Sequence, residues 1–234
     1  LKSSLTNPDG SPSPLLLNKE RGKRALAKAK ARKHLLEFTQ YTSPDYNTNW
    51  HHKIICDYLE RWAFGQGSKA IRRLMIFMPP GSGKSELVSR RLPAWIFGKN
   101  PNVGIMATSY AASLVEDMNI DVQRIMDSDA YREVFPEVSL SNRNSRNSLV
   151  GSTASRNRGN FEIVGHKGYY KCAGVGGSIT GKRFFYGIID DPLRGRQDAE
   201  SITIRNTTYN WYVNDFYTRR LNQDARILIT LTRW

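Results

Sequence analysis

The sequence has little of three things. Cysteine occurs only twice in 234 residues, at Cys56 and Cys172, which excludes a disulfide-stapled scaffold and a four-cysteine zinc site. No apolar run approaches the roughly 18 residues that a transmembrane helix needs. Acidic residues are scarce: 21 Asp and Glu stand against 35 Lys and Arg, a net charge of +14. The 39% of hydrophobic residues is enough to bury a core, so disorder of the whole chain is excluded.

The excess of positive charge is concentrated in two windows. Residues 19–33 and residues 142–183 each contain eight basic residues and a single acidic one, whereas the rest of the chain carries equal numbers of both signs. Such stretches are typical of contacts with a polyanion, and nucleic acid is the polyanion that they favour. A solvated helix face and a solvated loop are the alternative interpretation. The candidate nucleic-acid contacts in the first window are Lys23, Arg24, Lys28, Lys30, Arg32 and Lys33.

Apolar periodicity predicts alternating strands and helices after a separate N-terminal part. The composition of residues 1–18 predicts a flexible leader, and that of residues 25–38 predicts a basic helix. We therefore expect a leader and helical arm over 1–40 and one globular domain over 41–234. The expected strands are 74–78, 103–107, 184–189 and 227–231, and the expected helices 50–64, 84–97, 112–126 and 199–217. Pro93 predicts a kink or an early end within 84–97. Residues 141–160 read as a polar loop or hairpin, and 169–181 are glycine-rich. This alternation predicts an α/β fold with a mainly parallel central sheet flanked by helices.

A glycine-rich turn, Met-Pro-Pro-Gly-Ser-Gly-Lys-Ser over residues 78–85, lies between the first expected strand and the helix after it. Its glycines let successive backbone N–H groups face phosphate oxygens, and the helix N-terminus adds partial positive charge. Lys84 would reach the β- and γ-phosphates, and Ser85 would bind Mg²⁺. Met78 stands where the first glycine of such loops is usual, and an ordinary glycine turn is the alternative. The candidate ATP-binding residues of the loop are Pro80, Gly81, Ser82, Gly83, Lys84, Ser85 and Glu86.

Two adjacent carboxylates follow the apolar run at 184–189. Asp190 fits a Mg²⁺ ligand at the end of a strand, and Asp191 fits the acid that orients or deprotonates an attacking water. Two acids after a buried strand can also begin a loop or cap a helix. The phosphate loop upstream favours the catalytic interpretation.

In this order, the segments resemble the large terminase subunit of tailed double-stranded DNA bacteriophages. The resemblance covers residues 46–234, and it rests on Pro-Pro-Gly-Ser-Gly-Lys-Ser-Glu at 79–86, Ala-Thr-Ser-Tyr at 107–110, the glycine-rich stretch leading into Ile-Ile-Asp-Asp-Pro at 188–192, and Thr-Leu-Thr-Arg-Trp at 230–234. It implies a P-loop NTPase of the additional-strand type that hydrolyses ATP to pump double-stranded DNA into a procapsid.

Carried over by position, the resemblance implies a role for each matching residue. Lys84 contacts phosphate, Ser85 and Asp190 bind Mg²⁺, and Asp191 is the catalytic acid, at a position where many relatives have Glu. The closing segment is similar to the family's coupling motif, which senses the γ-phosphate and passes the change to DNA-contacting elements. A core strand with polar ends is the alternative for that segment. The candidate coupling residues are Thr230, Thr232 and Arg233.

The sequence leaves the arginine of the site open. Charge on the transferring phosphoryl group calls for one, and the phosphate loop carries none. Arg156 or Arg158 could act in trans from a ring neighbour, and Arg90 or Arg91 could act in cis. Each could equally contact a DNA backbone or solvent.

The adenine is expected beside residues 46–53, which precede the first strand. Trp50, His51 and His52 are candidates for stacking or hydrogen bonding with the base. Packing against the sheet edge is the alternative interpretation of these side chains.

The resemblance also implies cofactors and partners. These are ATP, Mg²⁺, double-stranded DNA, a portal protein on the procapsid, a small terminase subunit and further copies of the chain in a pentameric ring, in the host cytoplasm and without a membrane. Large terminases continue into a nuclease domain, and we expect no such domain or activity in residues 1–234. Two alternatives stay open: another DNA-dependent ATPase or helicase, and a basic nucleic-acid-binding protein with an inactive nucleotide site.

Overall fold

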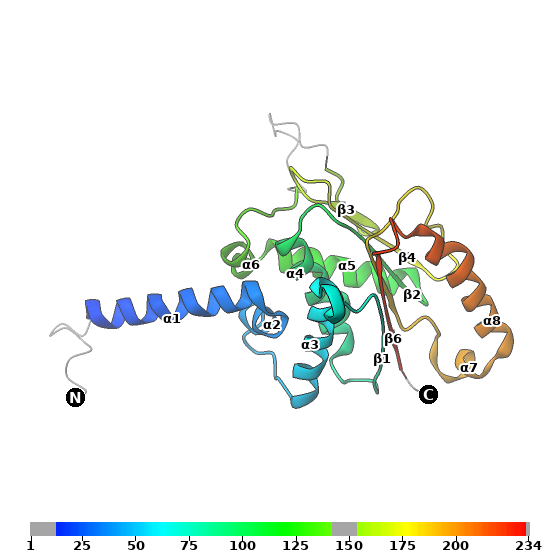
Figure 1. The fold of residues 1–234 in the computed structure, drawn as a ribbon, viewed down its shortest axis with the longest axis horizontal. Coiled ribbons are helices and arrows are strands. Elements are labelled where there is room, and N and C mark those ends of the chain that lie inside the picture. The colour runs from blue at the N-terminus through cyan, green and yellow to red at the C-terminus, as the bar shows by residue number, and fades with distance from the viewer. Residues whose placement is uncertain (1–12, 142–153, 233–234) are drawn as a thin grey trace.

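The protein is built around one six-stranded sheet, seen in a computed structural model that describes residues 13–141 and 154–232 (Figure 1). The strands are β1 (Arg73–Phe77), β2 (Gly104–Ser109), β3 (Asn160–Glu162), β4 (Tyr169–Gly174), β5 (Tyr186–Asp190) and β6 (Arg226–Leu231). Their order is β1-β6-β5-β2-β4-β3. The first five are parallel, and β3 pairs antiparallel with β4.

The sheet confirms the expected α/β fold and four of its strands. The apolar runs predicted as strands are β1, β2, β5 and β6, each within two residues of its expected bounds. One strand, β6, is inserted between β1, which leads into the phosphate loop, and β5, which ends at Asp190. The strand that leads into the loop and the strand that ends at Asp190 are therefore separated by one parallel strand.

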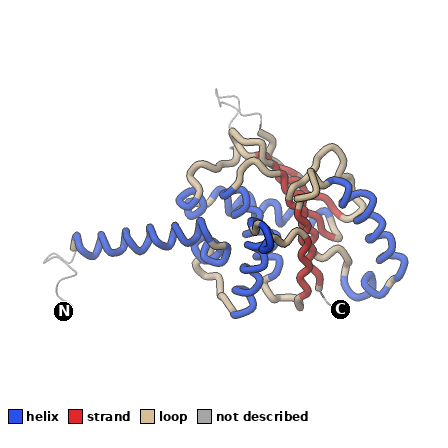
Figure 2. The backbone as a smooth tube through the Cα atoms, viewed as in Figure 1, coloured by secondary structure: helices blue, strands red, loops and turns tan. Residues whose placement is uncertain are grey.

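Helices cover both faces of the sheet (Figure 2). One face carries α1 (Pro14–Lys33), α2 (Leu35–Thr42), α3 (Trp50–Phe64), α4 (Leu92–Lys99), α5 (Ala112–Asp127) and α6 (Asp129–Val134). The other carries α7 (Gly195–Glu200), α8 (Ile202–Trp211), the π-helical turn η3 (Tyr212–Phe216) and the 3₁₀ turn η4 (Tyr217–Arg219), while the 3₁₀ turn η1 (Gly67–Lys69) follows α3. Within the part of the chain described, no helix is both long and apolar enough to cross a bilayer.

The core has two parts because neighbouring residues of a strand point to opposite faces. Ile188 of β5 packs into the larger cluster, under α2 to α6. Ile189 packs into the smaller one, together with Trp211 and Phe216. All five residues of β5 are buried, so the strand that carries the candidate acid is held from both sides.

The N-terminal part differs from the expectation of a flexible leader over 1–18 and one helix over 25–38. Helix α1 begins at Pro14, within the expected leader. The helix ends before His34, whose backbone is extended. The Glu60 carboxylate of α3 accepts the Leu35 N–H at 2.7 Å and lies 3.1 Å from His34 Nδ1. This long-range contact starts α2, and no local pattern signals it.

Pro93 neither ends the helix nor leaves it regular. A π-helical segment, η2 (Glu86–Arg91), leads into α4, and the Leu92 N–H bonds to the Leu87 carbonyl five residues back. The wider π turn accommodates the proline, which can supply no N–H of its own. The expected helix over 84–97 is therefore confirmed as helical, with an irregular first half.

One strand was not predicted from the sequence, and two helices were predicted as one. Strand β4 lies in the stretch read only as glycine-rich, and its buried positions alternate at Tyr170, Cys172 and Gly174. The expected helix over 199–217 is divided at Ser201, whose hydroxyl accepts the Ile204 N–H and starts α8. Most of the expected loop at 141–160 lies outside the described residues, and its end forms the start of β3.

Replacing Gly98 by alanine is expected to destabilise the fold by about 1–3 kcal/mol, because overpacking a core costs that much. A β-carbon at Gly98 would overlap the ring of Phe135, which is itself buried. Urea unfolding measures the loss. The matched control is Gly22→Ala in exposed α1, where nothing lies within 4 Å and the better helix propensity is expected to stabilise. Equal stability of Gly98→Ala and the parent chain would contradict the packing described.

Candidate active site

The turn between β1 and η2 has the backbone of an anion-binding loop. Gly81 and Gly83 have φ of 73° and 78°, in the left-handed region that glycine adopts without strain. The N–H groups of Gly81, Ser82 and Gly83 have no acceptor within the described residues. Successive free N–H groups before a helix form a concave site for phosphate. Pro80 and Gly81 are exposed, so a ligand can reach the loop.

Lys84 begins the helical turn after the loop and is 6% exposed. Its ammonium group lies 2.7 Å from Asp191 Oδ2 and 2.9 Å from Asp191 Oδ1, and it also donates to the Thr232 hydroxyl. The structure thus brings together three residues that the sequence assigned to phosphate, catalysis and coupling. Asp191 is the anionic partner of Lys84 within the described residues.

Asp190 ends β5 with only 2% of its surface exposed. Ser89 Oγ donates to its Oδ2 at 2.6 Å, and the Thr230 hydroxyl donates to its Oδ1. Thr230 is the residue opposite Asp190 in the register of β5 and β6, so the parallel pairing fixes this contact. Sequence reasoning missed Ser89. Its only signal was its place one helical turn after Ser85.

Asp191 leaves the sheet with φ of 45°, a left-handed conformation rare outside glycine and best tolerated by Asn and Asp. Its Oδ1 accepts the Thr232 N–H at 2.7 Å, and its own N–H donates to the Thr230 carbonyl at 3.0 Å. These bonds turn the carboxylate toward Lys84 and away from the adjacent Asp190. Two consecutive acids therefore have different surroundings. Asp190 is enclosed, and the Asp191 side chain is 26% exposed.

The donors present suit magnesium. Asp190 supplies a carboxylate and Ser85 a half-buried hydroxyl, and Mg²⁺ prefers oxygen ligands and is commonly held by one or two protein groups together with phosphates. No group of three or more His, Cys, Asp or Glu side chains in the described residues could hold a metal by itself. This donor set fits a metal that arrives with a nucleotide.

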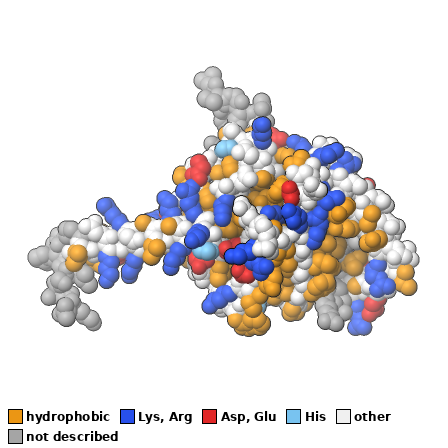
Figure 3. All heavy atoms as spheres, viewed as in Figure 1, with side chains coloured by type: hydrophobic (Ala, Val, Ile, Leu, Met, Phe, Trp, Pro, Cys, Tyr) orange, Lys and Arg blue, Asp and Glu red, His pale blue; other side chains and the backbone are white. Residues whose placement is uncertain are grey.

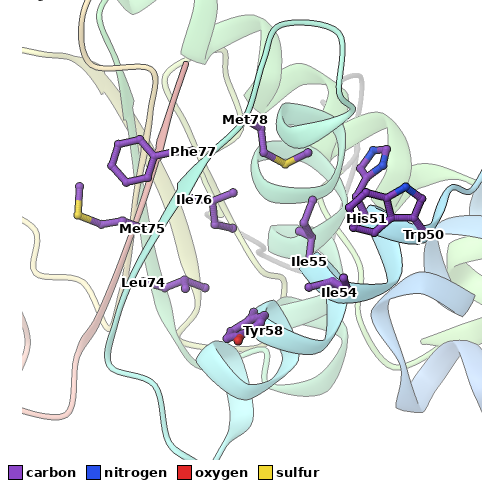
Figure 4. A pocket seen from close by; sticks show the side chains of 10 residues that line it. All are labelled: Trp50, His51, Ile54, Ile55, Tyr58, Leu74, Met75, Ile76, Phe77 and Met78. Carbon is purple, nitrogen blue, oxygen red and sulfur yellow. The ribbon is translucent and has the colours of Figure 1, made fainter. Parts of the chain in front are cut away.

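An apolar groove of about 390 Å³ lies beside the loop, between α3 and β1 (Figure 4). Ile54 and Tyr58 of α3 face Ile76 and Met78 across it, while Met75 and Phe77 point to the other side of β1 (Figure 4). Trp50 and His51, the expected adenine contacts, line its end nearest the loop, and Trp50 is 70% exposed.

His51 and His52 both approach the phosphate loop. Their Nε2 atoms lie 3.3 Å and 3.0 Å from the Ser82 carbonyl oxygen. His52 is 7% exposed and is absent from the lining of the groove, whereas His51 belongs to it. The two neighbouring histidines therefore differ in position, although the sequence grouped them.

The arginines just after the loop are occupied elsewhere. Arg91 pairs with Glu86 at 2.7 Å and donates to the Thr42 hydroxyl at 2.9 Å. Arg90 pairs with Asp121 of α5 at 2.8 Å. Glu86, expected near ATP, is thus held by Arg91.

The two candidate trans arginines have unlike surroundings. The Arg156 side chain is 10% exposed, pairs with Asp127 and donates to the Ser141 carbonyl at 2.9 Å. The Arg158 side chain is 62% exposed and pairs with Asp117 at 2.7 Å on the surface of α5. The coupling candidate Arg233 lies outside the described residues.

The first basic window lies on α1, which projects from the body with Lys and Arg side chains along it (Figure 3). Arg24 and Arg32 pair with Glu133 and Glu137 at the base of the arm. Lys28 is half-buried. The other candidate contacts are exposed and have no ion-pair partner in the described part of the chain: Lys23, Lys30 and Lys33.

Cysteine chemistry takes no part in this site. Cys56 and Cys172 are both free and buried. Burial raises the pKa of each thiol to about 12, so neither is a thiolate at neutral pH.

Known proteins resemble the chain in sequence and in fold. The family profile "Terminase large subunit, T4likevirus-type, N-terminal" matches residues 75–234. A comparison with curated proteins gives no match. Among solved structures, the large terminase of bacteriophage HK97 is 12% identical over 86% of this chain and 37% of its own, with a TM-score of 0.46.

Two further structures are similar to the same degree. A variant of the large terminase ATPase domain of Thermus phage P74-26 is 16% identical over 80% of this chain and 65% of its own, and a thermophilic bacteriophage large terminase in complex with ADP is 10% identical over 75% and 37%, both with a TM-score of 0.46. The chain therefore spans less than two thirds of each of these relatives. Because the family profile covers well over half of the sequence and includes the loop, both acids and β6, the chain belongs to the large terminase subunit family.

Proposed function

We propose that this chain is the ATP-hydrolysing motor part of a terminase that packages double-stranded DNA into a procapsid. The observation that carries the proposal is the phosphate loop, whose three free N–H groups lie next to a buried lysine. That lysine touches Asp191, the acid that follows β5, with β6 lying between β5 and the strand that leads into the loop. Such a combination serves phosphoryl transfer, where catalysis consists mainly of positioning and charge stabilisation.

Each residue of the site has a distinct task in this proposal. The loop N–H groups and Lys84 bind the β- and γ-phosphates, and Asp191 orients the attacking water and accepts its proton. Ser85 and Asp190 hold Mg²⁺, which supplies charge neutralisation on the phosphate oxygens when bound. Ser89 and Thr230 keep the Asp190 carboxylate in place, because both donate hydrogen bonds to it.

The Lys84–Asp191 pair gives nucleotide binding a consequence for the acid. A γ-phosphate at the loop competes with Asp191 for the Lys84 ammonium group, which has three donors and no other anionic partner among the described residues. Asp191 then retains the Thr232 N–H and faces the site as a free base. We therefore place Thr232 between the phosphate-sensing lysine and the acid, in the coupling role.

The base of the nucleotide lies in the apolar groove of Figure 4 in this proposal, with Trp50 and His51 at its entrance. Its volume of about 390 Å³ is within the range of pockets for small ligands, and its lining is largely hydrophobic. The exposed indole of Trp50 can stack on a purine.

An arginine for the transferring phosphoryl group comes from outside the subunit's own loop in this proposal. All four candidate arginines form ion pairs, but the side chains of Arg90, Arg91 and Arg156 are at most 25% exposed. The Arg158 side chain pairs with Asp117 and is 62% exposed, and this surface position allows it to reach a ring neighbour. The proposed assembly is a pentameric ring at the portal protein, with a small terminase subunit, in the host cytoplasm.

ATP turnover by the purified chain, with and without double-stranded DNA, tests the proposal when oligomer mass is recorded under both conditions. We expect turnover that rises with DNA. DNA binding without nucleotide affinity would instead indicate a nucleic-acid-binding protein with an inactive nucleotide site. Strand separation by the pure chain would indicate a helicase.

Replacing the three exposed lysines of α1 (Lys23→Gln, Lys30→Gln and Lys33→Gln together) is expected to weaken DNA binding and flatten its salt dependence. Each lost phosphate contact should reduce the slope of log K against log salt by about 0.9. Titrations at several salt concentrations measure it. Lys53→Gln with Lys69→Gln, outside both basic windows, is the control. An unchanged slope in the triple variant would remove α1 from the DNA interface.

A further inference from the structure

His52 has one fixed tautomer because its two ring nitrogens have different partners. The Asn49 N–H donates to Nδ1 at 3.0 Å, which closes a capping box at the start of α3. Nδ1 must therefore be unprotonated, and the ring hydrogen is on Nε2. The Nε2–H then donates to the Ser82 carbonyl at 3.0 Å.

This hydrogen bond fixes more than one oxygen atom. The Ser82 carbonyl and the Gly83 N–H belong to one trans peptide unit, so they point in opposite directions. When the carbonyl is held against His52, the Gly83 N–H is aimed away from α3. Glycine at 83 would otherwise permit this peptide to flip, since it adopts either sign of φ at little cost. His52 thus selects the orientation in which Gly83 presents a donor to an anion.

The packing leaves little room for another arrangement. A β-carbon at Gly83 would lie 2.8 Å from His52 Nε2 and 3.4 Å from the Tyr46 hydroxyl, so the histidine contacts the backbone of the loop directly. The Tyr46 ring lies against the imidazole with 5.3 Å between centroids. His52 is buried beneath the loop and outside the groove proposed for the base.

We propose that His52 is a positioning residue that orients the Ser82–Gly83 peptide for phosphate binding, and that it makes no contact with the base. The inference rests on the proposed function, because it takes the loop as the site of the ATP phosphates. It separates His52 from His51, which lines the groove and lies farther from the same carbonyl.

Two amide substitutions differing by one methylene test the inference. In His52→Asn the side chain can still accept the Asn49 N–H but is too short for the Ser82 carbonyl. In His52→Gln it is long enough to donate to that carbonyl. Calorimetric titration of the full chain with ATP and with inorganic tripolyphosphate, which has no base, gives two affinities for each variant, and thermal unfolding verifies that both fold.

We expect His52→Asn to lose about ten-fold in affinity for both ligands, by the same factor. A ten-fold loss corresponds to about 1.4 kcal/mol, which is typical of one such hydrogen bond. His52→Gln should bind both ligands within about three-fold of the parent chain. His51→Ala should weaken ATP more than tripolyphosphate. Loss of ATP affinity alone in His52→Asn, or parent-like binding of both ligands, would overturn the inference. A parent chain that binds neither ligand would overturn the proposed function itself and the inference with it.

Discussion

Replacing Lys84 by methionine is expected to reduce ATP turnover by about 10²–10³-fold or more, the loss typical when one donor to a developing negative charge is removed. Methionine keeps the length and apolar stem of the side chain, so packing around a residue only 6% exposed changes little. What is lost is the ammonium group that touches both Asp191 and Thr232. Nucleotide affinity should fall together with turnover, because in the proposed function this group contacts the phosphates both before and during the reaction.

Steady-state hydrolysis and ATP titration measure the two effects on the same preparation. Lys69→Met, in the exposed turn η1, is the matched control and should leave both unchanged. Hydrolysis by Lys84→Met at the rate of the parent chain would mean that the phosphate loop is not the site of turnover.

Asp191→Asn is expected to separate binding from hydrolysis. Asparagine tolerates the left-handed backbone at this position and keeps an oxygen for the Thr232 N–H, so the local structure should persist. An amide cannot accept the proton of the attacking water, and turnover should fall by about 10²–10⁴-fold, the usual contribution of a general base. ATP should bind at least as tightly as before, because the competing carboxylate on Lys84 has been neutralised.

The two variants together distinguish a residue needed for nucleotide binding from one needed only for hydrolysis. Lys84→Met is expected to lose binding and turnover, whereas Asp191→Asn loses turnover alone. Single-turnover hydrolysis with bound ATP measures the chemical step directly, and Asp215→Asn, an exposed carboxylate outside the site, is the control. Parent-like turnover in Asp191→Asn would assign the base to another residue.

Much of the fold and the outline of the site could be predicted from the sequence, for identifiable reasons. Strands β1, β2, β5 and β6 are short apolar runs with clear ends, and burial on both faces leaves this signal intact. The loop at 78–85 and the pair Asp190 and Asp191 are local motifs, so their chemistry can be inferred from consecutive residues without knowledge of the fold. Their proximity in the structure agrees with the rule that sites in such sheets form at the carboxyl ends of the strands.

What could not be predicted depends on contacts between distant segments. The break at His34 is set by Glu60, and the π-helical turn before Pro93 has no reliable sequence signature. Ser89 becomes a partner of Asp190 only once η2 is placed against β5. His51 and His52 have distinct positions because His52 accepts the Asn49 N–H and is buried under the loop, whereas His51 lines the groove. Two adjacent identical residues give no sign of this difference in the sequence.

Strand β6 connects the site to the far end of α3. At its start, Arg226 donates to carbonyls at the C-terminus of α3, those of Arg61 at 3.3 Å and Gly65 at 2.9 Å. At its end, Thr230 and Thr232 hold the two acids, while the N-terminus of the same helix holds the loop through His52. Helix α3 is therefore hydrogen-bonded at one end to the phosphate loop and at the other end to the strand whose threonines hold the two acids. A displacement of α3 is expected to disturb both the loop and the two carboxylates.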